Sequence, residues 1–143
     1  MPKTTVLLAD DNSAILDHLS KMIEKEKSYT VVAAISDGTL VVSECLSLKP
    51  DIITLDISMG EVSGISIARQ LGELGCTAKI IFLTVHEDLD YVTAAIGAGG
   101  SAYVVKSRLN LDLFSAIHAV LSNKLFVSPT LLYGADQNRG GLL

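Results

Sequence analysis

Four charged side chains of this 143-residue chain stand directly after apolar runs. Asp10 and Asp11 follow a first run, Asp56 follows a second and Lys106 follows a third. Carboxylates gathered at the ends of buried strands repel one another strongly, so they persist together only around a cation or with shifted pKa values. Lys106 could bring a fixed positive charge to the same place. An acidic cluster with one lysine therefore indicates a metal-assisted site for phosphate chemistry.

The segments that must position these side chains alternate between short β-branched runs and longer stretches with apolar residues at helical spacing. Strands are expected at Thr4–Ala9, Thr30–Ile35, Asp51–Leu55, Lys79–Leu83 and Ala102–Val105. Helices are expected between and after them, with capping residues at Asn12 or Ser13, Asp37, Ser63 and Asn110.

Nearly continuous apolar strands that alternate with helices predict an α/β fold, a doubly wound five-stranded parallel sheet with helices on both faces. Ligands of such sheets collect outside the carboxyl ends of the strands, near the point where the strand order reverses. The polar residues at these ends are Asp10, Asp11, Asp56, Thr84 and Lys106. The sequence therefore predicts that they meet at one edge of the sheet.

Composition restricts the partners and the setting of the chain. A hydrophobic fraction of 49% suits one compact domain, and a net charge of −5 argues against nucleic-acid binding through this domain. Cys45 and Cys76 lack the spacing of a metal site and are expected to be reduced thiols. No secretory signal and no membrane-spanning stretch is expected. These features predict a cytoplasmic protein without a membrane partner.

Four sequence segments together resemble the receiver domain of two-component response regulators. They are Leu8–Asn12, Thr54–Met59 with Gly64 shortly after it, Phe82–Thr84 and Tyr103–Lys106. The resemblance rests on the order and spacing of these segments, and it covers about Thr4 to Asn123. Membership would imply the flavodoxin-like receiver fold and a signalling switch rather than an enzyme.

The resemblance implies a role for each acidic residue. Asp56 would be the phosphoacceptor, taking a phosphoryl group from a sensor histidine kinase or a small phosphodonor. Asp10, Asp11, Asp56 and the backbone carbonyl of Ser58 would hold Mg²⁺. This set is chemically reasonable, because Mg²⁺ prefers a few carboxylates together with water and phosphate oxygens.

The resemblance also implies how a signal would leave the site. Thr84 and Lys106 would contact the phosphoryl oxygens, and Tyr103 would change rotamer when Thr84 moves. The expected result is a homodimer formed on phosphorylation. Two residues depart from the family pattern, since Gly60 and Ser107 stand where prolines are usual.

Within the family, Leu83–Asp88 and Leu125–Pro129 resemble the NarL-type subfamily, whose members carry a C-terminal DNA-binding domain. We therefore expect residues 1–124 to form the receiver domain and residues 125–143 to form a linker stub or flexible tail. Phosphorylation would control a DNA-binding effector absent from this chain, which makes transcription regulation the expected output. A stand-alone receiver that acts as an adaptor is the alternative.

Two other classes of protein are compatible with a similar sheet. A Mg²⁺-dependent phosphatase with an aspartate nucleophile typically has a second acid two residues later, where this chain has Ser58. A flavodoxin-like cofactor binder needs a phosphate loop after the first strand, but Asp10 and Asp11 place negative charge there. Both are weaker hypotheses than the receiver.

Overall fold

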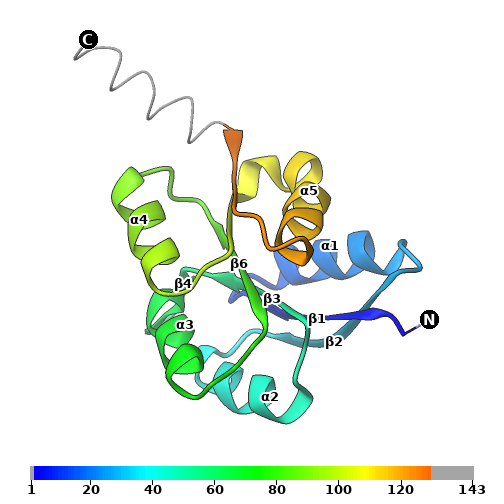
Figure 1. Cartoon of the computed structure of the whole chain (residues 1–143), viewed down its shortest axis with the longest axis horizontal. Helices are drawn as coiled ribbons and strands as arrows, with labels where there is room; N and C mark the ends of the chain where they lie inside the picture. The colour runs from blue at the N-terminus through cyan, green and yellow to red at the C-terminus, as the bar shows by residue number, and fades with distance from the viewer. Residues whose placement is uncertain (1, 130–143) are drawn as a thin grey trace.

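The computed structural model describes residues 2–129, which build a parallel sheet covered by helices on both faces (Figure 1). Six strands lie in the order β2-β1-β3-β6-β7-β8. Their bounds are β1 (Thr4–Ala9), β2 (Tyr29–Ile35), β3 (Ile52–Asp56), β6 (Lys79–Thr84), β7 (Ala102–Val105) and β8 (Phe126–Val127). The doubly wound parallel sheet predicted from the sequence is confirmed.

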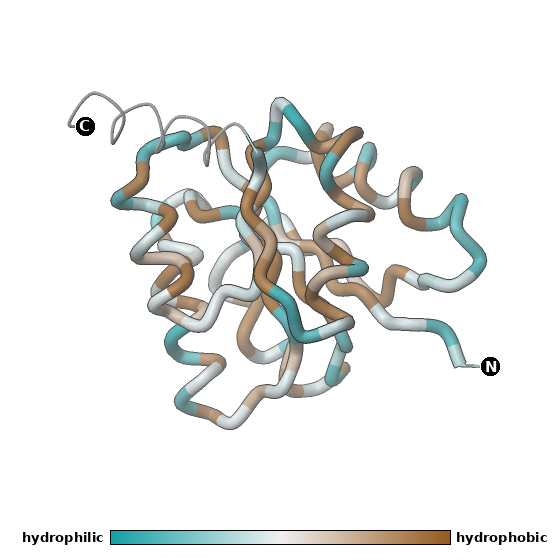
Figure 2. Tube along the Cα trace, turned by 45° about the horizontal axis from the view of Figure 1, so that its top comes forward, coloured by the Kyte–Doolittle hydropathy of each residue, from teal (hydrophilic) through white to brown (hydrophobic). Residues whose placement is uncertain are grey.

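The helices divide between the two faces of the sheet. One face is covered by α1 (Ser13–Glu24) and α5 (Leu109–Leu121), and the other by α2 (Val41–Leu48), α3 (Gly64–Glu73) and α4 (Leu89–Gly97). Each face of the sheet has its own hydrophobic core, and successive strand residues point into alternate cores. Leu7 accordingly packs on the α2–α4 side and Leu8 on the α1–α5 side. The central strands are accordingly hydrophobic along much of their length in Figure 2, whereas the helices alternate between hydrophobic and hydrophilic residues. No helix among residues 2–129 is long and apolar enough to cross a membrane.

The strand order brings the predicted site residues to one edge of the sheet. The chain leaves β1 for the outer strand β2 and then crosses back to β3 on the other side of β1. The point where the order reverses therefore lies between β1 and β3. Asp10 directly follows β1, Asp56 and Thr84 are the last residues of β3 and β6, and Lys106 directly follows β7.

Local capping explains where several helices begin. The Asn12 side chain accepts hydrogen bonds from Ala14 and Ile15 N–H groups, and Asp37 caps the 3₁₀ helix η1 (Gly38–Leu40) that leads into α2. The predicted start of the last helix at Asn110 is wrong. The 3₁₀ helix η2 (Lys106–Arg108) runs directly into α5, and the Asn110 side chain instead lies 2.7 Å from the His18 ring.

The sheet has one more strand than the sequence predicted. Strand β8 pairs in parallel with β7, through Ala102 with Phe126 and Tyr103 with Val127. Residues 126 and 127 lie in the segment that we expected to be a linker or tail, so the division at residue 124 falls before the sheet is complete. The part of that segment from residue 130 onward lies outside the described residues.

A small hairpin after β3 accounts for the first departure from the family pattern. Strands β4 (Ser58–Met59) and β5 (Val62–Ser63) pair antiparallel across a two-residue turn. Gly60 has φ +66°, a conformation that a proline ring cannot adopt. At the second departure, the bond before Ser107 is trans, since residues 2–129 contain no cis peptide bond.

Candidate functional site

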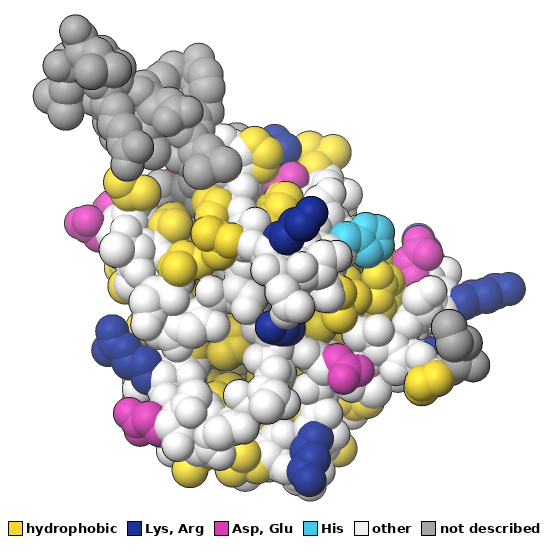
Figure 3. Space-filling view, in the orientation of Figure 1, with side chains coloured by type: hydrophobic (Ala, Val, Ile, Leu, Met, Phe, Trp, Pro, Cys, Tyr) yellow, Lys and Arg dark blue, Asp and Glu magenta, His cyan; other side chains and the backbone are white. Residues whose placement is uncertain are grey.

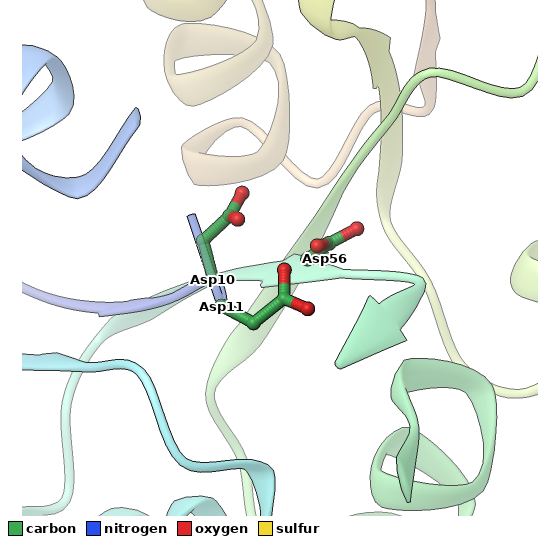
Figure 4. A group of neighbouring side chains, drawn as sticks. All are labelled: Asp10, Asp11 and Asp56. Carbon is green, nitrogen blue, oxygen red and sulfur yellow. The ribbon is translucent and has the colours of Figure 1, made fainter. Parts of the chain in front are cut away.

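Three aspartates form a compact acidic group at the switch point, as Figure 4 shows. One carboxylate oxygen from each of Asp10, Asp11 and Asp56 lies within 4.8 Å of the others. Asp10 and Asp56 are buried, with 0% and 4% of their surface exposed, whereas Asp11 is exposed. The group is thus open to solvent on the side of Asp11 and enclosed on the side of the sheet.

Lys106 supplies the positive charge that the sequence predicted. Its Nζ atom lies 2.7 Å from Oδ2 of Asp10 and 3.3 Å from Oδ2 of Asp56. Oδ2 of Asp10 has this ion pair but no well-aligned hydrogen bond, although it is fully buried. One ammonium group therefore faces two buried carboxylates and cannot neutralise both, which leaves an excess of negative charge.

This imbalance shifts the pKa values of the site. Burial, reinforced by the charge of Asp10, raises the pKa of Asp56 to about 6, although the Ser58 N–H and Lys106 oppose the shift. Burial alone would lower the pKa of Lys106, but its contacts with Asp10 and Asp56 outweigh burial and raise it. At neutral pH Asp56 is therefore mostly ionised and Lys106 is charged, which is the state that a nucleophilic carboxylate requires.

The acidic group fits a hard divalent cation. Its donors are carboxylate oxygens only, the ligand type that Mg²⁺ prefers, and the charge of Lys106 leaves the two buried carboxylates incompletely neutralised. The backbone N–H groups of Asn12 and Ser58 hold the other oxygens of Asp10 and Asp56, at 2.9 and 3.1 Å. Each of these two carboxylates is thereby oriented with one oxygen held by the backbone.

The loop after β3 approaches Asp56 so closely that only glycine fits at position 64. A Cβ atom on Gly64 would overlap the carbonyl oxygen of Asp56 and come within 2.9 Å of the Ile57 Cα. The Gly64 N–H donates a hydrogen bond to the Ile57 carbonyl at 2.7 Å. The start of α3 is thereby packed directly against the backbone that carries Asp56.

Thr84 and Tyr103 both contact the backbone of His86. The hydroxyl oxygen of Thr84 accepts a hydrogen bond from the His86 N–H at 2.9 Å, and the Tyr103 hydroxyl donates to the His86 carbonyl at 3.1 Å. Tyr103 is fully buried, and burial raises its pKa to about 12. Strand β8 pairs with β7 and covers its edge, so Tyr103 lies inside the sheet and not on an edge strand.

The His86 side chain reaches both the acidic site and the surface helix α4. Its Nε2 lies 3.4 Å from the Ser58 hydroxyl, and its ring stacks on Tyr91 with centroids 4.2 Å apart and planes at 12°. The sequence gave no sign of the stack of His86 on Tyr91, because contact between a loop and a helix leaves no periodic pattern.

The structure thus brings together the predicted acidic residues and Lys106, and it places Thr84 and Tyr103 on the adjoining strands.

Comparison with known proteins agrees with the resemblance to receiver domains seen in the sequence. The family model described as the response regulator receiver domain matches residues 6–118. The uncharacterized transcriptional regulatory protein YvfU of Bacillus subtilis is 30% identical over 135 residues, which cover 93% of this chain and 68% of that protein. A nitrate/nitrite response regulator protein homolog of Haemophilus influenzae is 30% identical over 129 residues, covering 90% and 62%. The chain spans 54% to 68% of the length of five such curated relatives.

Solved structures agree at the level of the fold. A LuxR-family two-component response regulator from Aurantimonas sp. superimposes with a TM-score of 0.89 at 27% identity, covering 96% of this chain and 99% of that one. The isolated receiver of RcsB from Salmonella enterica gives a TM-score of 0.83 at 23% identity. With the family match over residues 6–118 and these NarL- and LuxR-type relatives, the chain belongs to the response regulator receiver domain family.

Proposed function

We propose that Asp56 accepts a phosphoryl group and that the phosphorylated site changes the outer surface of the domain. The observation that carries this proposal is the ion-pair geometry, in which Lys106 faces both Asp56 at 3.3 Å and Asp10 at 2.7 Å beside the exposed Asp11. The donor would be the phosphohistidine of a sensor kinase or a small acyl phosphate. Receiver domains are signalling switches, so a slow later hydrolysis of the aspartyl phosphate belongs to the same proposal.

Each residue has a defined part in this transfer. A carboxylate oxygen of Asp56 forms a bond to phosphorus while the bond from phosphorus to the donor breaks and the donor keeps the electron pair. Lys106 pairs with a phosphoryl oxygen, and the Thr84 hydroxyl donates to another after it turns away from the His86 N–H. Mg²⁺ held by Asp10, Asp11, Asp56 and the Ser58 carbonyl would neutralise the charge on the phosphoryl oxygens.

The first test is phosphoryl uptake from acetyl phosphate. With Mg²⁺ present, we expect the intact mass of the chain to rise by one phosphoryl group, because Asp56 is ionised and accessible from the side of Asp11. Asp56→Ala should show no gain, and EDTA should suppress the gain in the wild type. The matched control is Asp17→Ala, which removes an exposed aspartate from α1 and should leave uptake unchanged. A gain that persists in Asp56→Ala contradicts the proposal.

We further propose that the switched surface includes α4 and binds a second copy of the chain. Val85, Leu89 and Tyr91 are 71%, 50% and 38% exposed, and hydrophobic side chains gather beside α4 on the face shown in Figure 3. Tyr91 stacks on His86, whose backbone contacts Thr84 and Tyr103. A change at Thr84 therefore has a short physical route to this surface. One solved relative, RcsB, is described as dimers bound to DNA.

Light scattering after size-exclusion chromatography tests the dimer. We expect the weight-average molar mass to rise toward twice the mass of one chain when Mg²⁺ and beryllofluoride are added. We expect the substitution Leu89→Asp to prevent this rise. The substitution places a charge on an apolar contact surface while leaving the phosphorylation site intact. Leu46→Asp on α2, at 42% exposure, is the matched control and should dimerise normally. An unchanged molar mass of the wild type with beryllofluoride bound contradicts the proposed dimer and leaves the proposed phosphorylation of Asp56 standing.

The names of the relatives support a proposal for the output of the switch. YvfU of Bacillus subtilis is named as a transcriptional regulatory protein, and so are DegU and YdfI. We infer that the phosphorylation state of this domain is passed to a DNA-binding segment, while the receiver itself makes no contact with nucleic acid. The net charge of −5 supports the second part of this inference.

A further inference from the structure

A buried polar cluster joins the end of β7, the start of α5 and the residue after β8. Asp112 on α5 accepts a hydrogen bond from the Ser128 hydroxyl at 2.8 Å and two from the Arg108 guanidinium, at 2.8 and 3.2 Å. The Ser128 hydroxyl oxygen in turn accepts the Val105 N–H at 3.1 Å. We call Arg108, Asp112, Ser128 and the Val105 N–H the β7–β8 clasp.

The clasp is enclosed by the fold. Ser128 is 0% exposed and Asp112 is 4% exposed, while Arg108 covers the carboxylate from the solvent side. A buried carboxylate needs its hydrogen bonds, because an unpaired buried polar group is strongly unfavourable. The Ser128 N–H also donates to the Tyr103 carbonyl at 2.9 Å. Ser128 is therefore tied to β7 by its backbone and by its side chain.

The clasp lies one residue away from Lys106, the lysine that faces Asp56. Val105, whose N–H it holds, is followed directly by Lys106, and Lys106 faces Asp10 and Asp56. Arg108 closes the 3₁₀ turn that begins at Lys106. The backbone on both sides of Lys106 is thus fixed by the clasp, and the direction of the lysine side chain depends on that backbone.

We propose that Asp112 and Ser128 are positioning residues that hold Lys106 for the phosphoryl group and couple the site to the docking of residues 126–128. The inference rests on the proposed function, because it concerns the lysine that receives the phosphoryl oxygen. Occupation of Asp56 fixes Lys106, which fixes the end of β7 and strengthens the clasp. By thermodynamic linkage, the clasp strengthens ligand binding at Asp56 by the same factor.

Hydrogen exchange of the wild-type chain tests the coupling without any substitution. The reporters are the Val105 and Ser128 amides, whose hydrogen bonds join β7 to the docked segment. We expect Mg²⁺ with beryllofluoride, which takes the place of the phosphoryl group on Asp56, to slow exchange at both amides by about fivefold or more. Exchange that changes less than twofold, in protein shown to bind beryllofluoride, overturns this inference and leaves the proposed function standing.

A serine substitution supplies the reciprocal measurement. Ser128→Ala should weaken beryllofluoride binding by about fivefold or more, since reciprocity requires a similar factor. Ser122→Ala removes an exposed serine just after α5 and should leave the affinity unchanged. A role in stability alone would lower the Tm of Ser128→Ala without changing the affinity of its folded form, and that result overturns the inference.

Hydrogen exchange in wild-type protein that binds beryllofluoride separates this inference from the proposed function. If Ser128→Ala does not fold, the exchange of the wild type decides the question. If the wild type binds no beryllofluoride with Mg²⁺ present, both the proposed function and this inference fall together.

Discussion

Gly64→Ala is expected to destabilise the domain by about 3 kcal/mol and to abolish phosphoryl uptake by Asp56 in the protein that remains folded. A Cβ at this position would overlap the Asp56 carbonyl oxygen and approach the Ile57 Cα at 2.9 Å. Backbone atoms in a buried strand end cannot move aside as a flexible side chain can. The loop must therefore shift, and the carboxylate of Asp56 shifts with it.

The control for this substitution lies in the same helix. A Cβ on Gly72 in α3 meets no atom within 4 Å, so Gly72→Ala should leave stability unchanged or raise it by up to about 1 kcal/mol. Urea unfolding gives both stabilities, and intact mass after acetyl phosphate treatment gives the uptake. Equal stability of Gly64→Ala and Gly72→Ala would contradict this steric argument, because it would mean that a Cβ atom at position 64 can be accommodated.

Asp56→Asn is expected to stabilise the metal-free protein at pH 8 by about 3 kcal/mol. The folded protein holds the Asp56 proton more tightly than the unfolded chain does, since its pKa is about 6 against an ordinary value of 3.8. The charged form is thus disfavoured by folding, and the wild type loses stability as the pH rises from about 4 through about 6. Asparagine carries no charge, so the stability of the variant does not fall in this way as the pH rises.

The advantage of the variant should therefore grow between pH 4 and pH 7 and then level off. Urea unfolding in EDTA at pH 5 and pH 8 measures it, with Asp17→Asn on the exposed face of α1 as a control expected to change stability by less than about 0.5 kcal/mol. Saturating Mg²⁺ should narrow the difference, because it binds the folded wild type preferentially. An Asp56→Asn variant less stable than the wild type at pH 8 in EDTA would contradict the electrostatic account of the site.

The strands and the acidic site could be predicted because each rests on a strong local signal. Apolar runs fix the strands of a parallel sheet, and the positions of Asp56 and Thr84 at the ends of β3 and β6 follow from where those runs stop. The meeting of strand ends at one edge then follows from the topology. The charges of Asp10 and Lys106 lie next to those ends, so the sequence predicted that they share this edge, but the ion pairs also depend on the strand order, which the sequence pattern does not give.

The features that escaped prediction depend on tertiary contacts. Strand β8 has only two residues, Phe126 and Val127, too few for a periodic pattern, and it is held by β7 and the clasp. The stack of Tyr91 on His86 joins a helix to a loop. Asn110 looked like a helix cap, but its side chain meets His18 while η2 leads into α5 without a break. Local sequence cannot decide which distant neighbour a polar side chain finds.

Strand β8 also bears on where the domain can be cut for expression. An exposed strand edge with free N–H and C=O groups is a template for pairing with other chains, and short covering strands are one way in which proteins suppress such aggregation. A fragment that ended at the expected boundary of residue 124 would uncover β7 along the pairs Ala102–Phe126 and Tyr103–Val127. It would also leave the Val105 N–H without its serine acceptor. Residues through Ser128 therefore belong with the domain as a guard against self-association.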